Sequence, residues 1–522
     1  MRRTKSQLTK PKPLSAARKP RHTDGCFSGD FEQDYRAMQA LLADAIDMKS
    51  RRISTADRRS IGIFFYADMV DNNLLSRDII KPLLQMHGLL LPENVLRHIS
   101  VPETWALSDM QTAADSMSDG AVVLVLEGQS QAILASLPQV EHRPIERSQS
   151  EDVIIGPHES FSESLATNVA VVRRLLSSTK LKAESVEIGR LSRTKANILY
   201  VQDVAQQKLV DELRARLSRI DIDHCQGAAY LTDFLEDDPR SIFPLLRVTE
   251  RPHRVAGALA EGRVVLMAHG DPTALVIPTF FPEFIQSSED YFERPIIGTF
   301  LRCLRILSSF LAVFLPGLWV TLVSFHHGII PKPLFSSIAA GRESVPLPTV
   351  LEAFLLLLAF DIVIEASTRL PSAVGQAIGI VGAIILGQSA VQASLVSPAM
   401  TIVVALAGLA TYTSPSPVLL GPMRLLKYLV LIASSILGLY GFVWAIILLA
   451  LHMTCKRSFG YPYLYPVAPF DPKGVLDIVA RLPLYRLDLR PGFLAAKNQR
   501  RMAGQLRPTP NKESADGRSD EK

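Results

Sequence analysis

Five polar side chains that could attract a cation lie within an otherwise apolar part of this sequence: Glu352, Asp361, Glu365, Gln388 and Gln392. Asp361 and Glu365 are four residues apart, so they share one face of a helix, and the two glutamines share a face for the same reason. A charge at the centre of a bilayer costs about 2.5–3.5 kcal/mol, so within a membrane such faces should turn inward. Repeated around a ring of subunits, the carboxylates would favour cations. A second interpretation pairs Glu365 with Arg369 as a structural ion pair at the interface.

Patterns for catalysis or metal binding are not found elsewhere in the sequence. It has no GxGxxG, Walker A or HExxH motif. The four cysteines are scattered, and Asp221-Ile-Asp-His-Cys225 lacks a second Cys/His pair at ligand spacing. Residues 100–295 also lack a clustered nucleophile. We therefore expect no enzyme activity, no cofactor and no metal ion.

The elements that must position the five polar residues are long apolar helices. Three runs contain no Asp, Glu, Lys, Arg or His: 20 residues at Ile306–Phe325, 52 at Ser372–Met423 and 24 at Tyr428–Leu451. A bilayer core of about 30 Å needs about 20 apolar residues of helix. The 52-residue run has room for two spans, with a break at Ser397-Pro398. We therefore predict an all-α polytopic membrane domain over residues 296–455.

Segment 350–367 leaves the topology open because it contains all three of the acidic residues named above. We predict four full spans, with this segment half-inserted or amphipathic. Four spans return the C-terminal tail, residues 456–522, to the side of the N-terminal half. The tail would then place three tyrosines at headgroup level, namely Tyr461, Tyr463 and Tyr465. A fifth span would put Lys456-Arg457 outside, which the positive-inside rule disfavours.

Four glycines within the 52-residue run predict close helix packing. Gly375 and Gly379 form a GxxxG pattern, and Gly382 and Gly387 follow. Small residues allow two helix backbones to approach each other closely. Beside them, the amides of Gln388 and Gln392 should meet another polar group or line a wet path, because lone polar groups are disfavoured in lipid.

The N-terminal half carries most of the charge. Residues 1–23 contain eight Lys/Arg and no acid, and no apolar core follows them, so they are not a signal peptide. We predict a disordered basic arm over residues 1–29 and a cytoplasmic location up to residue 295. Arg302 and Arg305, at the start of the first span, fit that orientation. The net charge of +5 suits contact with anionic membrane lipid better than nucleic-acid binding.

A repeated hairpin predicts that the cytoplasmic domain is α/β, with two related lobes at residues 30–140 and 141–295. At an offset of 142 residues, Gly120 aligns with Gly262 and Gly128 with Gly270. Within each copy the two glycines flank an apolar strand, which leads into a second strand. The pattern predicts further strands at 61–66, 184–189 and 196–202, and helices at 30–60, 76–82, 112–117, 163–177 and 205–217. The succession of strand, helix and strand in the second lobe suggests a βαβ unit.

Motifs spread over Phe64–Leu494 also match one known family. In the soluble half they include Arg77-Asp-Ile-Ile-Lys-Pro-Leu83, Gly156-Pro-His-Glu-Ser-Phe-Ser-Glu163 and Glu289-Asp-Tyr-Phe-Glu-Arg294. In the apolar half they include Leu315-Pro-Gly-Leu-Trp-Val-Thr-Leu-Val-Ser-Phe325, Gly387-Gln-Ser-Ala-Val-Gln392, Val396-Ser-Pro398 and Arg457-Ser-Phe-Gly460. In this combination the chain resembles the A subunits of GerA-type spore germination nutrient receptors. It departs from the family at His253, where Asp is usual.

The resemblance implies a role in breaking spore dormancy from the spore inner membrane. It implies a transporter-like B subunit that binds the nutrient and a lipoprotein C subunit as partners. It also implies a homo-oligomer that forms a nutrient-gated cation channel. Two alternatives stay open: a sporulation paralogue acting as an accessory ion channel, and a membrane-anchored signalling scaffold without conduction. A self-contained transporter would show two matching sets of broken spans, which the sequence lacks.

Overall fold

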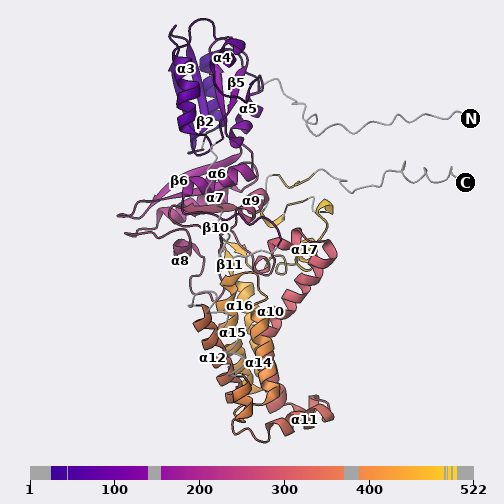
Figure 1. Cartoon of the computed structure of the whole chain (residues 1–522). Coiled ribbons are helices and arrows are strands. Elements are labelled where there is room, and N and C mark those ends of the chain that lie inside the picture. The colour runs from indigo at the N-terminus through magenta and orange to yellow at the C-terminus, as the bar shows by residue number, and fades with distance from the viewer. Residues whose placement is uncertain are drawn as a thin grey trace, which may run out of the picture. The chain divides into compact units, whose positions relative to one another are not determined.

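The computed structural model describes residues 25–43, 45–138, 155–368, 387–486, 489–490, 492–494 and 498–502. Most of the predicted basic arm lies outside these residues. The chain forms two compact units (Figure 1). One contains the first of two five-stranded sheets, and the other contains the second sheet together with a helical region. We call the two sheets with their helices the first and second lobes.

The first lobe is a sheet covered by helices on both faces. Its strands are β1 (Met48–Ser54), β2 (Ser60–Tyr66), β3 (Thr104–Leu107), β4 (Ala121–Leu126) and β5 (Ala132–Ser136), in the spatial order β1-β2-β4-β5-β3. Its helices include α1 (Phe31–Leu41), α4 (Pro92–His98) and α5 (Met110–Ser116). Every residue of the central strand β4 is buried. Alternate residues of β4 enter two different apolar clusters, so both faces of the sheet are covered.

The second lobe repeats this strand order. Its strands are β6 (Leu181–Ile188), β7 (Thr194–Val201), β8 (Arg247–Thr249), β9 (Val264–Ala268) and β10 (Ala274–Ile277), in the order β6-β7-β9-β10-β8. Its helices include α6 (Leu165–Leu175), α7 (Gln207–Ser218), α8 (Thr232–Leu235) and α9 (Pro252–Glu261). The apolar side of α7 packs on the sheet through Leu209, Val210 and Leu213. The strands predicted from the sequence in this lobe are confirmed.

The glycines that revealed the repeat have the same conformation in both lobes. Gly120 and Gly262 each cap a helix with a positive φ, at 84° and 100°. Gly128 and Gly270 have φ of 77° and 82° in the hairpin turns. Left-handed backbone strongly favours glycine. The two lobes therefore share strand order and turn geometry, as expected of related lobes.

Three local predictions in the lobes are wrong. The helix predicted over 30–60 ends at Leu41, and β1 follows as an edge strand whose charged side chains hide the β alternation. The βαβ unit is absent because β7 pairs antiparallel with β9, and β10 pairs antiparallel with both β9 and β8. The helix predicted from Ser76 begins at Asn72, capped by Asp71, and continues past Pro82 to Leu84 after a π-helical turn.

The helical region follows the second lobe. Its main helices are α10 (Pro295–Ser324), α11 (Lys332–Arg342), α12 (Thr349–Thr368), α14 (Pro398–Thr411), α15 (Leu420–Leu437) and α16 (Leu439–Cys455), and residues 387–392 are also helical. α10, α12, α14, α15 and α16 gather in a bundle, and α11 lies across one end of it (Figure 1). Within the described residues, Pro295–Ser324 and Pro417–Leu437 are long and apolar enough to cross a membrane.

The single span predicted at Tyr428–Leu451 is wrong. Gly438, with φ 57° and ψ −132°, ends α15 and starts α16, which pack against each other as a helical hairpin. A Cβ at Gly438 would lie 3.0 Å from the ring of Phe325, so the turn is also tightly enclosed. The sequence concealed this reversal because the residues around Gly438 are as apolar as a helix interior.

The chain beyond α16 returns to the second lobe. β11 (Arg457–Ser458) and β12 (Tyr461–Pro462) form a small hairpin, and α17 (Pro472–Val479) follows. Phe459 enters the core of the second lobe, and Tyr463 is fully buried beside Phe243 and Phe281. The prediction that these tyrosines lie at headgroup level is therefore wrong for Tyr463, because its ring is enclosed by protein.

Candidate functional site

One ion pair joins the predicted acidic residue Asp361, on α12, to α15. Lys427 Nζ donates to Asp361 Oδ1 over 2.8 Å, and the hydroxyl of Tyr428 donates to Oδ2 over 2.6 Å. The side chain of Lys427 is only 3% exposed. Opposite charges attract strongly where little water screens them, so this pair holds α12 against α15.

A second pair lies about one turn closer to the C-terminus of α12 and to the N-terminus of α15. Arg424 Nη1 on α15 is 3.7 Å from Glu365 Oε2 on α12. Two acids of α12, Asp361 and Glu365, therefore face two bases of α15. The predicted pairing of Glu365 with Arg369 is untested, because Arg369 lies outside the described residues. The sequence reading missed Arg424 and Lys427, although their three-residue spacing, which separates the two uncharged runs, was a usable signal.

Glu352 is fully buried near the start of α12. Its Oε1 accepts hydrogen bonds from the backbone N–H and the hydroxyl of Ser397, each at 2.5 Å. Ser397 is also the N-cap of α14. Arg342 of α11 lies 3.8 Å from Oε2. Glu352 therefore holds the start of α12 against the start of α14. It lies in the first turn of α12, well before Asp361 in the same helix.

Of the remaining predicted residues, those that the structure describes do not contact the Asp361 pair. Gln388 and Gln392 are exposed side chains of the helical segment 387–392. Gly375, Gly379 and Gly382 lie outside the described residues, so their predicted packing role stays a prediction. A Cβ at Gly387 would make an ordinary van der Waals contact with Thr401 at 3.7 Å, so this glycine is not required for close packing. Among the described residues, two glycines that the sequence analysis did not single out lie at close helix contacts. A Cβ at Gly317 would lie 2.8 Å from Val430, and one at Gly408 would lie 2.2 Å from Phe360.

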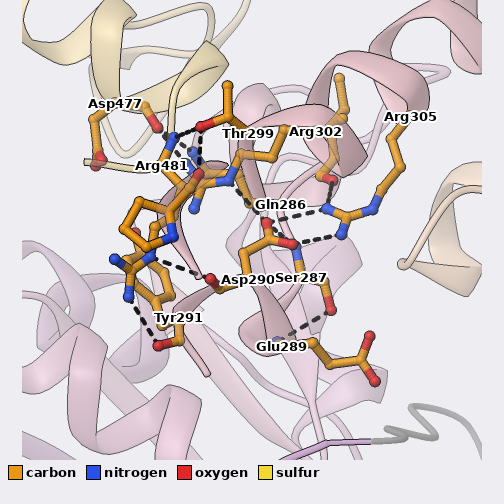
Figure 2. A network of polar contacts seen from close by, with 12 residues as sticks. Gln286, Ser287, Glu289, Asp290, Tyr291, Thr299, Arg302, Arg305, Asp477 and Arg481 are labelled. Atoms are coloured by element: carbon orange, nitrogen blue, oxygen red, sulfur yellow. Dashed lines mark hydrogen bonds and ion pairs between the residues drawn. The ribbon is translucent and has the colours of Figure 1, made fainter. Parts of the chain in front are cut away.

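A second polar cluster lies where the second lobe meets α10, and we call it the junction (Figure 2). Asp290 is fully buried at its centre. Arg302 Nε donates to Asp290 Oδ2 over 2.8 Å, and Arg305 Nη1 donates to the same oxygen over 3.0 Å. Ser287 and Asp290 form a capping box around the short helix 288–291. Burial alone would raise the pKa of Asp290, but the hydrogen bonds from Arg305 and Arg302 outweigh it and lower that pKa.

The C-terminal helix α17 completes the junction. Arg302 donates to the backbone carbonyl of Asp477. Arg481 donates to the carbonyls of Asp290 and Tyr291, at 3.2 and 3.0 Å, and both guanidinium groups lie over the Tyr291 ring (Figure 2). Burial raises the pKa values of Tyr291 and of the Asp477 carboxyl. The junction thus joins three segments that are far apart in the sequence.

Only some residues of the junction were singled out from the sequence. It identified Arg302 and Arg305 as orienting charges at a membrane boundary, and Asp290 as one letter of a motif. It gave no role to Asp477 or Arg481. Arg302 and Asp477 are separated by 175 residues in the sequence, and no short-range sequence pattern predicts a contact between residues so far apart.

Comparison with known proteins gives consistent matches over most of the chain. A family model described as Bacillus/Clostridium GerA spore germination protein matches residues 36–493. Spore germination protein KA of Bacillus subtilis (strain 168) is 34% identical over 88% of this chain and 85% of the relative. Spore germination protein A1 of the same strain is 33% identical over 87% and 95%. The crystal structure of the N-terminal domain of the A subunit of the Bacillus megaterium spore germinant receptor GerK3 matches with a TM-score of 0.41 at 24% identity, covering 50% of this chain and 99% of that one.

Proposed function

Since the chain belongs to the GerA family of spore germination proteins, we propose that it is a membrane subunit of a germinant receptor that helps trigger germination. In this proposal it assembles as a homo-oligomer and forms a nutrient-gated path for cations. Its partners are a transporter-like B subunit that binds the nutrient and a lipoprotein C subunit. The complex resides in the spore inner membrane.

The helical region supports insertion in a membrane. Large apolar side chains point outward from its helices, among them Ile402 at 68% and Ile436 at 70% exposure. Such surface is unfavourable in water and fits lipid or another subunit. The start of α10 and the chain after α16 both contact the second lobe, which supports an even number of crossings. We propose that both lobes and the C-terminal segment lie in the cytoplasm.

The observation that carries the conduction proposal is the Asp361 ion pair. The Asp361 side chain is 16% exposed. An acid that is largely enclosed by apolar helices is costly, and function commonly accounts for it. Here its charge is balanced by Lys427, so the acidic side chain is not free to attract a cation. We propose that this arrangement is the closed state. Opening would part Lys427 from Asp361, and the carboxylates of Asp361 and Glu365, with Gln388 and Gln392, would then line the path.

Cation flux through liposomes that contain the assembled receptor tests this proposal. Lys427→Gln should raise the cation leak, because Asp361 loses the partner that neutralises it. Asp361→Asn should lower the preference for cations over chloride. If both variants assemble and conduct like the parent, conduction along this face is wrong. If the parent complex conducts nothing while its spores germinate normally, the non-conducting scaffold is the better account.

A further inference from the structure

We propose that residues 456–481, which we call the C-terminal strap, transmit movement between the second lobe and the first and last helices of the helical bundle. This inference rests on the proposed receptor function, because it assigns a route for the signal within that receptor. The strap begins directly after α16, the last helix of the bundle, and ends against α10, the first helix of the bundle.

The first part of the strap fixes the end of α16 to the second lobe. Lys456 pairs with Asp238, and the backbone N–H of Gly460 donates to Asp237 over 2.8 Å. The hydroxyl of Ser458 donates to the carbonyl of Leu245 over 2.7 Å and accepts the N–H of Thr279 over 3.1 Å. A displacement of this lobe would therefore pull directly on α16.

Two aromatic side chains of the strap anchor it in apolar surroundings. Phe459 lies in the core of the second lobe, with the guanidinium of Arg216 4.1 Å from its ring centre. Tyr463 is fully buried in a cluster that combines Phe243 of the lobe with Met453 of α16. The Tyr463 hydroxyl has no hydrogen-bond partner among the described residues, so its ring carries the contact.

The last part of the strap reaches the junction. The carbonyl of Asp477 accepts from Arg302, and Arg481 bonds the backbone of Asp290 and Tyr291. The N–H of Arg481 also donates to Thr299 Oγ1 on α10, over 3.1 Å. The same short segment thus holds the first and last helices to one lobe, so neither can shift alone without breaking these contacts.

A charge exchange tests the strap in spores that carry this chain, with rich nutrient broth as the germinant and with spores from which the chain is deleted as the reference. Asp238→Lys and Lys456→Asp should each raise the broth concentration that gives half-maximal potassium release, with the amount of receptor in the membrane unchanged. The double variant should restore the parental value, because the pair forms again with its charges exchanged. Tyr463→Ala should act like the single variants, and Tyr463→Phe should match the parent.

Three results would overturn the proposal. The single variants could respond at the parental broth concentration, or the exchanged pair could fail to restore it. Alternatively, the single variants and Tyr463→Ala could lose receptor from the membrane in proportion to their lost response, which would make the strap purely structural. If spores from which the whole chain is deleted respond to broth like the parent, the receptor function itself is refuted.

Discussion

Removing either Asp361 or Lys427 should be costly, because the other is left as an unpaired charge in a largely enclosed site, where the Lys427 and Asp361 side chains are 3% and 16% exposed. Breaking a buried pair by removing one partner typically costs about 3–5 kcal/mol, whereas replacing both partners can be neutral. We therefore expect Lys427→Met to lower the thermal unfolding midpoint of the detergent-solubilised protein. The double variant Asp361→Asn, Lys427→Met should recover most of that loss.

The neighbouring pair supplies the matched control. Glu365 has a side chain 53% exposed and stands 3.7 Å from Arg424, so its pair is open to its surroundings. Exposed pairs contribute at most about 1 kcal/mol, and Glu365→Gln should be nearly silent. If Lys427→Met and Glu365→Gln lower the unfolding midpoint equally, the Asp361–Lys427 pair contributes no more to stability than the exposed pair.

Asp290 makes a prediction about pH. Its lowered pKa means that its charged form stabilises the fold. This stabilisation is complete above the unfolded pKa of about 3.9 and is lost as the pH falls through the lower folded value. The unfolding midpoints of the parent and Asp290→Asn should therefore differ by a constant amount from about pH 5 to 7 and converge below about pH 4. A difference that grows on acidification would contradict the assignment.

At the residue scale, the sequence located the acids but not their partners. The four-residue spacing of Asp361 and Glu365 is visible within one helix, and the structure places both on the side that meets α15. Which helix they face depends on how the bundle packs, and no local spacing encodes that. The same limit explains why the Arg302 contact to Asp477 was invisible.

At the element scale, close packing of α10 on α15 depends on Gly317. A Cβ there would lie 2.8 Å from Val430 Cγ1 and 2.9 Å from Ser434 Oγ. Overpacking of this kind typically costs about 1–3 kcal/mol, so Gly317→Ala should destabilise the solubilised protein. Gly421→Ala on α15 is the control, because nothing lies within 4 Å of its added Cβ. Unfolding midpoints that rank the two variants in the opposite order would contradict this packing role.

Elements whose ends are marked by turn residues such as glycine were predicted well. The hairpins at Gly128 and Gly270 combine a glycine of positive φ with flanking apolar strands, and both formed where the sequence predicted them. The failures share the opposite property. Gly438 reverses the chain inside a run of apolar residues, and β1 carries charges that resemble a solvated helix. In both, tertiary packing decides the conformation and composition does not reveal it.

At the scale of the whole molecule, charge distribution separated the charged N-terminal half from the apolar region, and the repeated hairpin suggested two lobes within that half. The two sheets share one strand order. The sequence indicated this similarity only for one hairpin, which recurs at an offset of 142 residues. The return of the chain into the second lobe after α16 did not follow from charge, because Tyr463 and its neighbours resemble an interfacial anchor in composition. The second lobe therefore holds both the first and the last helix of the bundle.

The most direct test of the central claim is the rate of potassium release in nutrient broth from spores carrying Asp361→Asn. Asp57→Asn, an exposed acid in the first lobe, is the matched control. With equal receptor in the membrane, the cation path predicts release about tenfold slower for Asp361→Asn, equivalent to about 1.4 kcal/mol, and unchanged for the control. Release at the parental rate from both variants would contradict a cation path through Asp361.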